Sequence, residues 1–483
     1  MKNELKIKGI MLDPARVMER RETYSEFLKL FAQWGYNTLF WHFCDDEGCR
    51  LVFPSHPELA SAYAWTADET RAFIQEANEL GIQVIPEIEC LGHTSYITRH
   101  PQYQHLRDGL EGKDFAALAP AHPESQALLE DLLNDVCDIF PARQIHLGMD
   151  ETAFGEHPHT AELLKTKTKP EIFAEQICRL HGILEKRGKE TLIWGDHLRP
   201  VAESNMSDHL DEEAVSDFIA DSIPKDIIIC DWYYKPEIPA DRMDCFLGRG
   251  FRVLACPASS SYGMFGHPAD WNLDNLREFI ALAKQNVERG VIGAVNTVWC
   301  SGRYLNGTIH YANALAGHLM NAETESPRFA EEFIAEFFGV TDGLEIAEAL
   351  QTLHQISPDA FALFRGVPVP CEKPVVLSEE EHAFFQTLEK TCKQAAEQLQ
   401  KNRENVQAHI GDYDDILITA QALSFMGATS KDWKTAESLS ARASKAWDRT
   451  RHPDDPEKMG TPESGCGYFL QRLIQGIKNI TER

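Results

Sequence analysis

Short apolar segments alternate with amphipathic ones through the first two-thirds of this 483-residue chain. Strands that alternate with helices pair in parallel, and eight such units close into a (β/α)₈ TIM barrel. An open doubly wound sheet is the alternative, but the first strand leads to Asp13-Pro14 rather than to a glycine-rich phosphate loop. The expected strands are residues 5–12, 37–42, 82–88, 144–147, 191–194, 227–232, 251–255 and 291–299. The expected helices include residues 22–34, 68–80, 123–140, 170–187, 273–289 and 308–321.

Strand patterns stop near residue 326, and only helical patterns follow. We therefore predict an α/β fold with two domains: a catalytic barrel in residues 1–325 and a C-terminal α-helical domain in residues 326–483. The helical domain is compatible with a homodimer interface or with a lid over the barrel, and nothing in its sequence chooses between them. Its expected helices are residues 328–338, 343–356, 379–401, 413–426, 433–451 and 468–480.

The net charge limits the classes of molecule that this protein can bind. A net charge of −28 argues against nucleic acid or an anionic membrane, because both require a basic surface. No window approaches the roughly 20 apolar residues of a membrane span, and the N-terminus lacks the apolar core of a signal peptide. The 12 cysteines form no C-x-x-C pair, which is typical of reduced, buried thiols. We expect a cytoplasmic protein.

Two adjacent carboxylates, Asp150 and Glu151, follow the fourth strand directly. Such a pair is often only a solvated turn, but catalytic groups of barrel enzymes lie at the carboxyl ends of the strands. Other polar and aromatic residues follow the remaining strands and should meet at the same rim: Asp13, Arg16, Asp45, His93, Trp194, Asp196, Trp232, Tyr233, Tyr262, Trp299 and Arg303.

Carboxylates and a histidine beside three tryptophans suit a sugar substrate. A pyranose ring has apolar faces that pack on aromatic rings, and its hydroxyls bind carboxylates. Glycosidic cleavage also needs a carboxylic acid to protonate the leaving oxygen. A metal-dependent hydrolase is the rival enzyme class, but the first strand has no histidine pair of the kind that binds zinc. We expect neither cofactor nor metal.

Three ordered motifs resemble glycoside hydrolase family 20, the β-N-acetylhexosaminidases. Residues 34–50 are similar to the family's second strand, residues 81–94 to its third, and residues 145–151 (IHLGMDE) to its catalytic His-x-Gly-x-Asp-Glu motif. The resemblance covers roughly residues 5–320. It implies an exo-acting, retaining enzyme that removes terminal β-linked GlcNAc or GalNAc from a small oligosaccharide or glycoconjugate. The alternative is an inactive carbohydrate-binding protein on the same barrel.

The family works by substrate assistance, so the resemblance also implies residue roles. Glu151 is then the general acid, and Asp150 holds the 2-acetamido group as its carbonyl oxygen attacks the anomeric carbon. His93, backed by Asp45, binds Glu151 and tunes its proton affinity. Tyr262 is the expected donor to the acetamido oxygen, with Tyr233 and Tyr234 as alternatives. The walls of the pocket are assigned to Trp194, Trp232 and Trp299.

Departures from the family pattern affect sugar selectivity. The family has arginine before the first strand's glycine; this chain has Lys8, so either Lys8 or Arg16 grips the sugar hydroxyls. The eighth strand usually continues Trp-x-Glu, whereas Trp299 is followed by Cys-Ser. The acid expected two residues after Tyr262 is absent. Because the first strand starts close to Met1, we also expect this chain to lack the separate N-terminal domain common in the family. These features resemble the divergent, intracellular type of hexosaminidase, hexosaminidase D.

Several residues have a plain structural reading beside the functional one. His42 and His146 lie in apolar strands and are expected to be structural. Asp13 and Arg16 can pair to fix the first loop rather than bind substrate. Asp196 is either a sugar ligand or a support for the residues that are.

Overall fold

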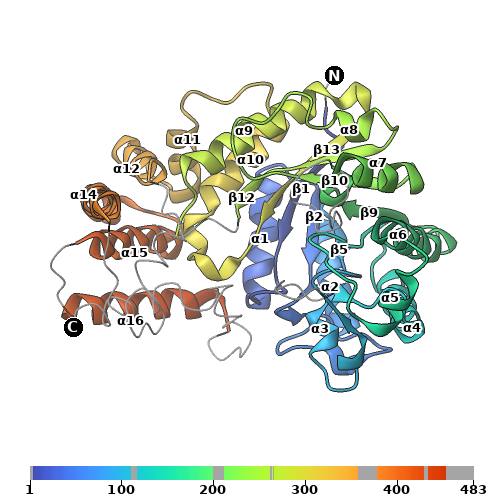
Figure 1. Cartoon of the computed structure of the whole chain (residues 1–483). Helices are drawn as coiled ribbons and strands as arrows, with labels where there is room; N and C mark the ends of the chain where they lie inside the picture. Colours follow the sequence, from blue (N-terminus) through green and yellow to red (C-terminus); the bar gives the residue numbers. More distant parts are fainter. Residues whose placement is uncertain are drawn as a thin grey trace.

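Eight parallel strands form a closed barrel in the computed structural model (Figure 1). The structure describes residues 4–109, 117–199, 212–261, 264, 266–356, 378–428 and 433–452, with residues 212–215, 381 and 433 described by their backbone alone. The first strand, β1, pairs with the last, β13, which closes the barrel. The predicted TIM barrel is therefore confirmed. Its strands are β1 (Ile7–Leu12), β2 (Thr38–His42), β5 (Gln83–Glu87), β8 (Gln144–His146), β9 (Glu190–Trp194), β10 (Ile228–Trp232), β11 (Arg252–Cys256) and β13 (Val291–Val298).

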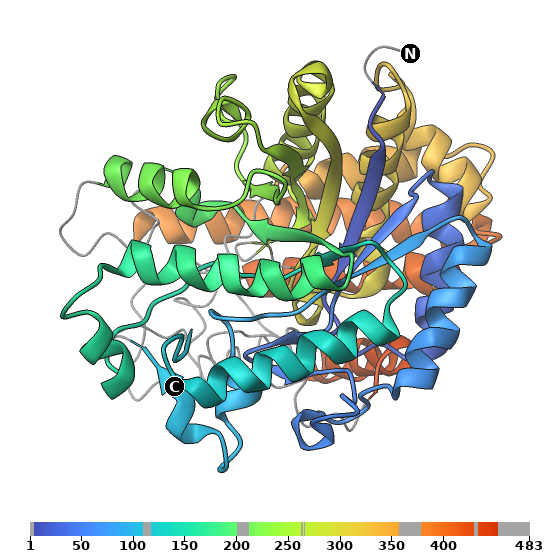
Figure 2. The ribbon, with the colours of Figure 1, turned by 90° about the vertical axis from the view of Figure 1, so that its right-hand side faces the viewer.

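Helices cover the outside of the strands, as in Figure 2, where the teal and green helices α4 and α6 lie across the near side. The predicted helices are all present with small shifts at their ends: α1 (Arg21–Gln33), α2 (Ala67–Glu79), α4 (Pro123–Ile139), α6 (Lys169–Lys186), α9 (Asp270–Gln285) and α10 (His310–Asn321). Other elements were not expected; except for α7, each is too short to carry a clear periodicity. They are α3 (Ser95–Thr98), α5 (Pro158–Leu163), α7 (Glu212–Ser222), α8 (Asp244–Leu247) and the hairpins β3–β4 (Cys44–Asp45, Gly48–Cys49) and β6–β7 (Arg107–Asp108, Ala117–Leu118).

Two apolar layers hold the barrel. Strand alternation sends one set of side chains inward, including Met11, Phe40, Ile85 and Leu254, and these fill the barrel's interior. The opposite set packs against the surrounding helices. The seventh strand breaks at Pro257 and resumes as β12 (Ala258–Ser260), which pairs with the end of β13.

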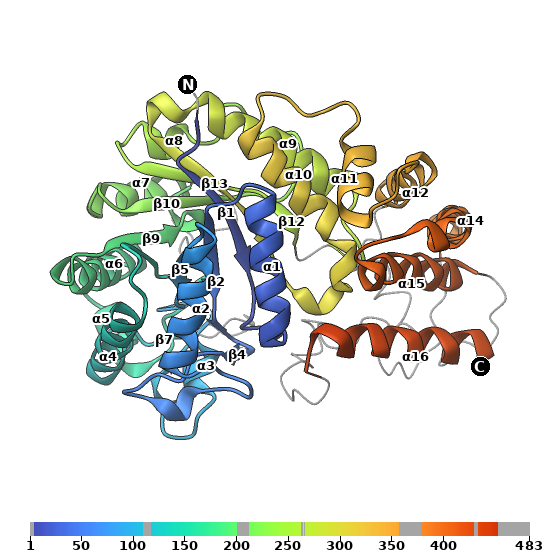
Figure 3. The ribbon, with the colours of Figure 1, turned by 180° about the vertical axis from the view of Figure 1, so that it is seen from behind.

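The C-terminal helices stack beside the barrel, next to α10 and the segment that follows β13 (Figures 1 and 3). They are α11 (Phe329–Phe338), α12 (Leu344–His354), α14 (Glu379–Asn402), α15 (Ile410–Gly427) and α16 (Trp433–Thr450). The helix expected at 468–480 lies outside the described residues. No helix in the described part of the chain is long and apolar enough to cross a bilayer.

Candidate active site

The acid pair lies on a tightly bent loop after β8. Three of its residues have left-handed backbone: Gly148 (φ 68°), Met149 (φ 80°) and Glu151 (φ 45°). At position 148 a Cβ atom would lie 1.9 Å from an oxygen of Glu89, so only glycine fits. Left-handed conformations at non-glycine residues cost free energy and persist where neighbouring contacts enforce them.

Those contacts come from the segment after β9. The Asp196 carboxylate accepts a hydrogen bond from the Glu151 backbone N–H at 3.0 Å. The His197 Nε2 accepts one from the Thr152 N–H, also at 3.0 Å. Asp196 is 5% exposed, so in this structure it supports the loop that presents Glu151.

His93 joins the acid pair to the end of β2. Its Nε2 lies 3.2 Å from Glu151 Oε2 and 3.9 Å from Asp150 Oδ2. Its Nδ1 faces two carboxylates, Asp46 at 3.1 Å and Asp45 at 3.3 Å. The structure thus brings together four of the five residues predicted to be catalytic, all except Tyr262. It adds Asp46, to which sequence reasoning assigned no role.

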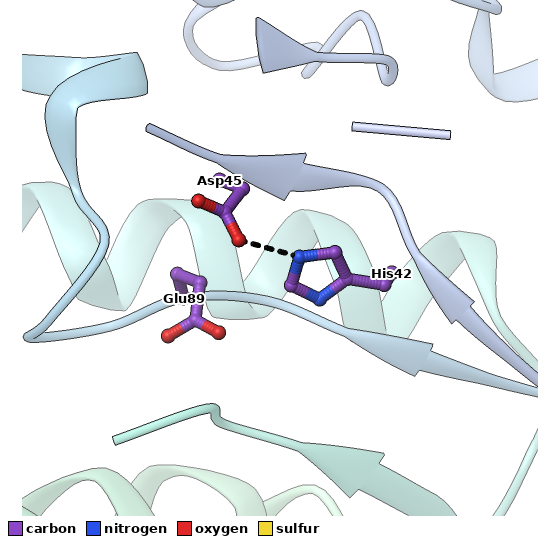
Figure 4. A group of neighbouring side chains, drawn as sticks. All are labelled: His42, Asp45 and Glu89. Atoms are coloured by element: carbon purple, nitrogen blue, oxygen red, sulfur yellow. Dashed lines mark hydrogen bonds and ion pairs between the residues drawn. The ribbon is translucent and has the colours of Figure 1, made fainter. Parts of the chain in front are cut away.

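A second, fully buried charged network is connected to His93 through Asp45. His42 Nε2 is 2.8 Å from Asp45 Oδ2 (Figure 4). On the other side of the ring, His42 Nδ1 is 3.2 Å from Glu87 Oε1. Glu87 also accepts the indole N–H of Trp194 at 2.7 Å. His42 was expected to be structural, and it is a buried link between two carboxylates. Trp194 is 1% exposed, so it forms the floor below the site rather than an open wall.

Burial and neighbouring charges shift the pKa values of the two acids in opposite directions. Burial, reinforced by Asp196 and Glu151, raises the pKa of Asp150 to about 7 against the pull of His93. For Glu151, burial is outweighed by the hydrogen bond and charge of His93, which lower its pKa. Burial also opposes the charge on His93, but Asp45 and its hydrogen bonds hold the pKa of His93 well above the ordinary value. Neighbouring acids with divergent pKa values are typical of catalytic sites.

Arg16 organises the opposite end of the charged network. Its guanidinium contacts Asp13 at 3.1 Å, Asp45 at 2.8 Å and Glu47 at 3.3 Å. It also lies over the Trp299 ring, 5.4 Å from the centroid. Asp13 and Arg16 therefore do pair, and Arg16 also links the His93 network to the aromatic side of the rim.

The aromatic side is built from β10 and β13. The Trp299 indole N–H donates to the Tyr234 hydroxyl at 2.7 Å, and Tyr234 stacks on Trp232 with centroids 5.2 Å apart. Tyr233 points elsewhere, with the Arg242 guanidinium 4.2 Å from its ring. Residues alternate in direction along an extended segment, so Tyr234, not Tyr233, joins Trp232 in this wall.

Lys8, Arg303 and Tyr262 were also predicted at the site. Lys8 lies near the start of β1, at the far end of the barrel, where its Nζ donates to Asn321 at 2.8 Å. Arg303 is 2% exposed and ends the short 3-10 turn, Ser301–Arg303, that follows Trp299. Tyr262 lies outside the described residues.

Some of these side chains are close enough to share a cation. One such group is His42, Asp45 and Glu89, whose ligand atoms lie within 4.8 Å of one another. However, both nitrogens of His42 face carboxylates, and against the effect of burial Glu87 and Asp45 hold the pKa of His42 well above its ordinary value. A protonated imidazole offers no lone pair to a metal. The other groups, Asp45–Asp46–His93 and His93–Asp150–Glu151, share the His93 that bridges the acids.

Comparison with known protein families shows which family this chain belongs to. The model described as glycosyl hydrolase family 20, catalytic domain, matches residues 6–288. The chain belongs to glycosyl hydrolase family 20. The resemblance carried by the second, third and fourth strands is confirmed, and Asp150, Glu151 and His93 all lie inside the family 20 match.

Relatives in family 20 are distant. A β-hexosaminidase of Vibrio furnissii is 31% identical over 179 residues, covering 31% of this chain and 29% of the relative. Human hexosaminidase D is 27% identical over 213 residues, covering 41% of this chain and 42% of the relative. The matches thus span less than half the length of these relatives.

Solved structures agree on the fold. The exo-β-N-acetylglucosaminidase of Vibrio harveyi, in complex with N-acetylglucosamine, aligns with a TM-score of 0.54 at 21% identity. The alignment covers 72% of this chain and 58% of that one.

Proposed function

We propose that this protein is an exo-acting, retaining β-N-acetylhexosaminidase that removes terminal β-linked GlcNAc or GalNAc from oligosaccharides or glycoconjugates. The observation that carries the proposal is the Asp150–Glu151 pair on a strained loop, bound to His93, in a chain of family 20. A protein that only bound sugar would have no use for a proton donor held in this way.

In the proposed reaction, the substrate's acetamido oxygen attacks the anomeric carbon while Glu151 gives its proton to the glycosidic oxygen. The C1–O bond breaks and a cyclic oxazolinium forms. Glu151, now a carboxylate, takes a proton from water as the water opens that ring at C1. Two displacements at one carbon retain the β configuration.

Asp150 stabilises the positive charge that the acetamido group gains. Its carboxylate has one buried oxygen without a hydrogen-bond partner among the described residues, which suits an N–H supplied by substrate. With a pKa of about 7, it is partly protonated at neutral pH in the free protein. A developing cation beside it favours the ionised form.

Glu151 must carry a proton when the substrate is bound, yet its pKa is lowered in the free protein. Its side chain is 41% exposed, so water still solvates the carboxylate. A sugar in the site displaces that water, and desolvation raises the pKa of a carboxyl group. Binding of the substrate should therefore raise the pKa of Glu151 and favour its protonated form.

Trp299, Trp232 and Tyr234 form the proposed wall for the sugar, with Arg16 at its edge. Because the Tyr234 hydroxyl accepts from Trp299, it keeps its own hydrogen for another acceptor. We propose Tyr234 as a donor to the acetamido oxygen, beside the earlier candidate Tyr262.

The domain boundary near residue 325 and a cytoplasmic location also remain predictions.

The test is release of p-nitrophenol from matched β-GlcNAc, β-GalNAc, β-glucoside and β-galactoside substrates. Cleavage restricted to the two N-acetyl sugars is expected, because only they carry the internal nucleophile. Cleavage of the plain sugars would contradict substrate assistance.

Glu151→Gln supplies the matched control. It should lower kcat on the preferred sugar by about 10²–10⁴-fold, the usual contribution of general acid catalysis, and leave affinity for N-acetylglucosamine near that of the parent. A parent protein that binds the sugar and cleaves none of the four substrates would instead be the carbohydrate-binding alternative.

A further inference from the structure

The end of α16 inserts an arginine into the barrel's rim. Arg451 is 1% exposed, although it comes from the helical region that stacks beside the barrel. Its Nε lies 2.9 Å from Glu19 Oε1. Its Nη1 donates to the Tyr304 carbonyl at 2.9 Å and its Nη2 to the Ser301 carbonyl at 2.7 Å.

A fourth contact completes the set. Nη2 also donates to Asn306 Oδ1 at 2.6 Å, and the guanidinium carbon lies 3.9 Å from the centre of the Trp447 ring. Several directed bonds plus a stacked face require a planar guanidinium; a lysine ammonium cannot reproduce them. The contacts of the Arg451 side chain therefore depend on the shape of the guanidinium as well as on its charge.

Three of these acceptors belong to one loop, residues 299–306, which follows β13. The loop begins with Trp299, the ring that binds Tyr234 and lies under Arg16. Its next residue, Cys300, has left-handed backbone (φ 53°), and its N–H donates to Asp13 at 2.9 Å. The loop is thus held from the barrel side by Asp13 and from the helical side by Arg451.

The neighbouring backbone reinforces this link. Glu19 and Arg451 form an isolated antiparallel β-bridge, and the Arg20 N–H donates to the Thr450 carbonyl at 2.7 Å. The Asn306 amide donates to the Thr450 hydroxyl at 3.1 Å. The segment after β1 and the loop after β13 thus both contact Thr450 and Arg451, at the end of α16.

We propose that Arg451 is a positioning residue of the active site: it fixes the 299–306 loop, and through it Trp299, so that the helical region completes the sugar-binding wall. The inference rests on the proposed function for its kinetic readout, but the order of the loop can be measured without catalysis.

The experiment compares Arg451→Ala and Arg451→Lys with Arg442→Ala in the full chain. Arg442 lies on the same helix and donates to Gln421 of α15, away from the rim. For Arg451→Ala we expect KM for the p-nitrophenyl sugar to rise about ten- to a hundredfold, as for a misplaced binding group, with a smaller change in kcat. Added methylguanidinium should restore part of the affinity. Arg442→Ala should leave KM unchanged.

Hydrogen exchange read by mass spectrometry provides the second readout. Peptides covering residues 299–306 should exchange faster in Arg451→Ala, while those covering residues 145–151 exchange as in the parent. If the alanine variant does not fold, Arg451→Lys, which can keep the ion pair with Glu19, should show the same effects at smaller size. If a folded variant keeps both the parent KM and the parent exchange in 299–306, the proposal is wrong. Altered exchange in a protein that cleaves none of the substrates would support the loop contact and remove the proposed function instead.

Discussion

The two sides of the rim are held together in different ways. On the acid side, His93 contacts residues 47 and 58 positions away, Asp46 and Glu151, through ion pairs centred on a buried imidazole. On the aromatic side, the Trp299 loop depends on partners 287 and 432 positions apart, Cys300 with Asp13 and Arg451 with Glu19. The proposed catalytic groups of the acid side follow adjacent strands, whereas the aromatic side is a surface assembled from distant segments. Substitutions on the acid side should therefore lower kcat, and substitutions on the aromatic side should weaken the affinity for the sugar.

Asp150→Asn should show the largest effect and test the acid side most directly. We expect kcat on N-acetyl substrates to fall about 10²–10³-fold, because a neutral amide cannot balance the oxazolinium charge, with little change in KM. The parent profile of kcat/KM should fall as the pH drops below about 7, where Asp150 takes up a proton, and the variant should lack this limb. A variant that keeps the parental rate would exclude the role assigned to Asp150.

The same substitution should also stabilise the protein at high pH. The folded pKa of Asp150 lies above the ordinary value of 3.8, so the folded state binds the extra proton between about pH 4 and 7. Stability from this group is present below pH 4 and is lost as the pH rises through 7. Asp150→Asn should therefore melt a few degrees higher than the parent at pH 8, with a smaller difference at pH 5, measured by calorimetry.

His93→Ala should have the next largest effect. It removes the hydrogen bond and charge that lower the pKa of Glu151, so the pKa of Glu151 should rise. We expect kcat to fall about 10- to 100-fold and the pH profile to shift. His105→Ala, at an exposed histidine bound to Glu124, is the matched control and should behave as the parent.

Tyr234→Phe tests the aromatic side. It leaves the Trp299 indole N–H without its acceptor, a loss that typically costs about 1–3 kcal/mol when the donor is buried, and it removes the proposed donor to the acetamido group. We expect kcat/KM to fall about tenfold. Tyr233→Phe should have no effect, and an equal loss in both variants would contradict the assignment of the wall.

Lys8→Met should have the smallest effect, because Lys8 lies at the opposite end of the barrel from the acid pair. KM and kcat should stay within about twofold of the parent, and stability within about 0.5 kcal/mol, as for most surface substitutions. A large rise in KM would mean that Lys8 does grip the sugar.

The acid side could be predicted from the sequence because its residues follow strands whose order is readable. Alternating strands and helices specify a closed barrel, and the barrel brings the ends of β2, β5 and β8 together. His93, Asp45 and the acid pair were therefore found without coordinates. The role of Asp196 was left open and Asp46 was given none, since both depend on which hydrogen bonds a bent loop makes.

The aromatic side was only partly predictable. Trp299 and Trp232 follow strands, but the choice between Tyr233 and Tyr234 depends on the register after β10. Lys8 was expected at the site because it occupies the family's arginine position, whereas strand alternation and its place near the start of β1 direct it elsewhere. No local signal marks Arg451: its pattern is that of an ordinary helix end, and its burial comes from a partner 432 residues earlier.

That separation also has a meaning in time. Ribosomes add roughly 5–20 residues per second, so 432 residues correspond to roughly 20–90 s between the synthesis of Glu19 and that of Arg451. During that interval the acid pair after β8 can already be in place, while Glu19 has no Arg451 to pair with. A growing chain therefore acquires its acid pair early and completes the proposed sugar wall late, and a chain interrupted between them holds the first without the second.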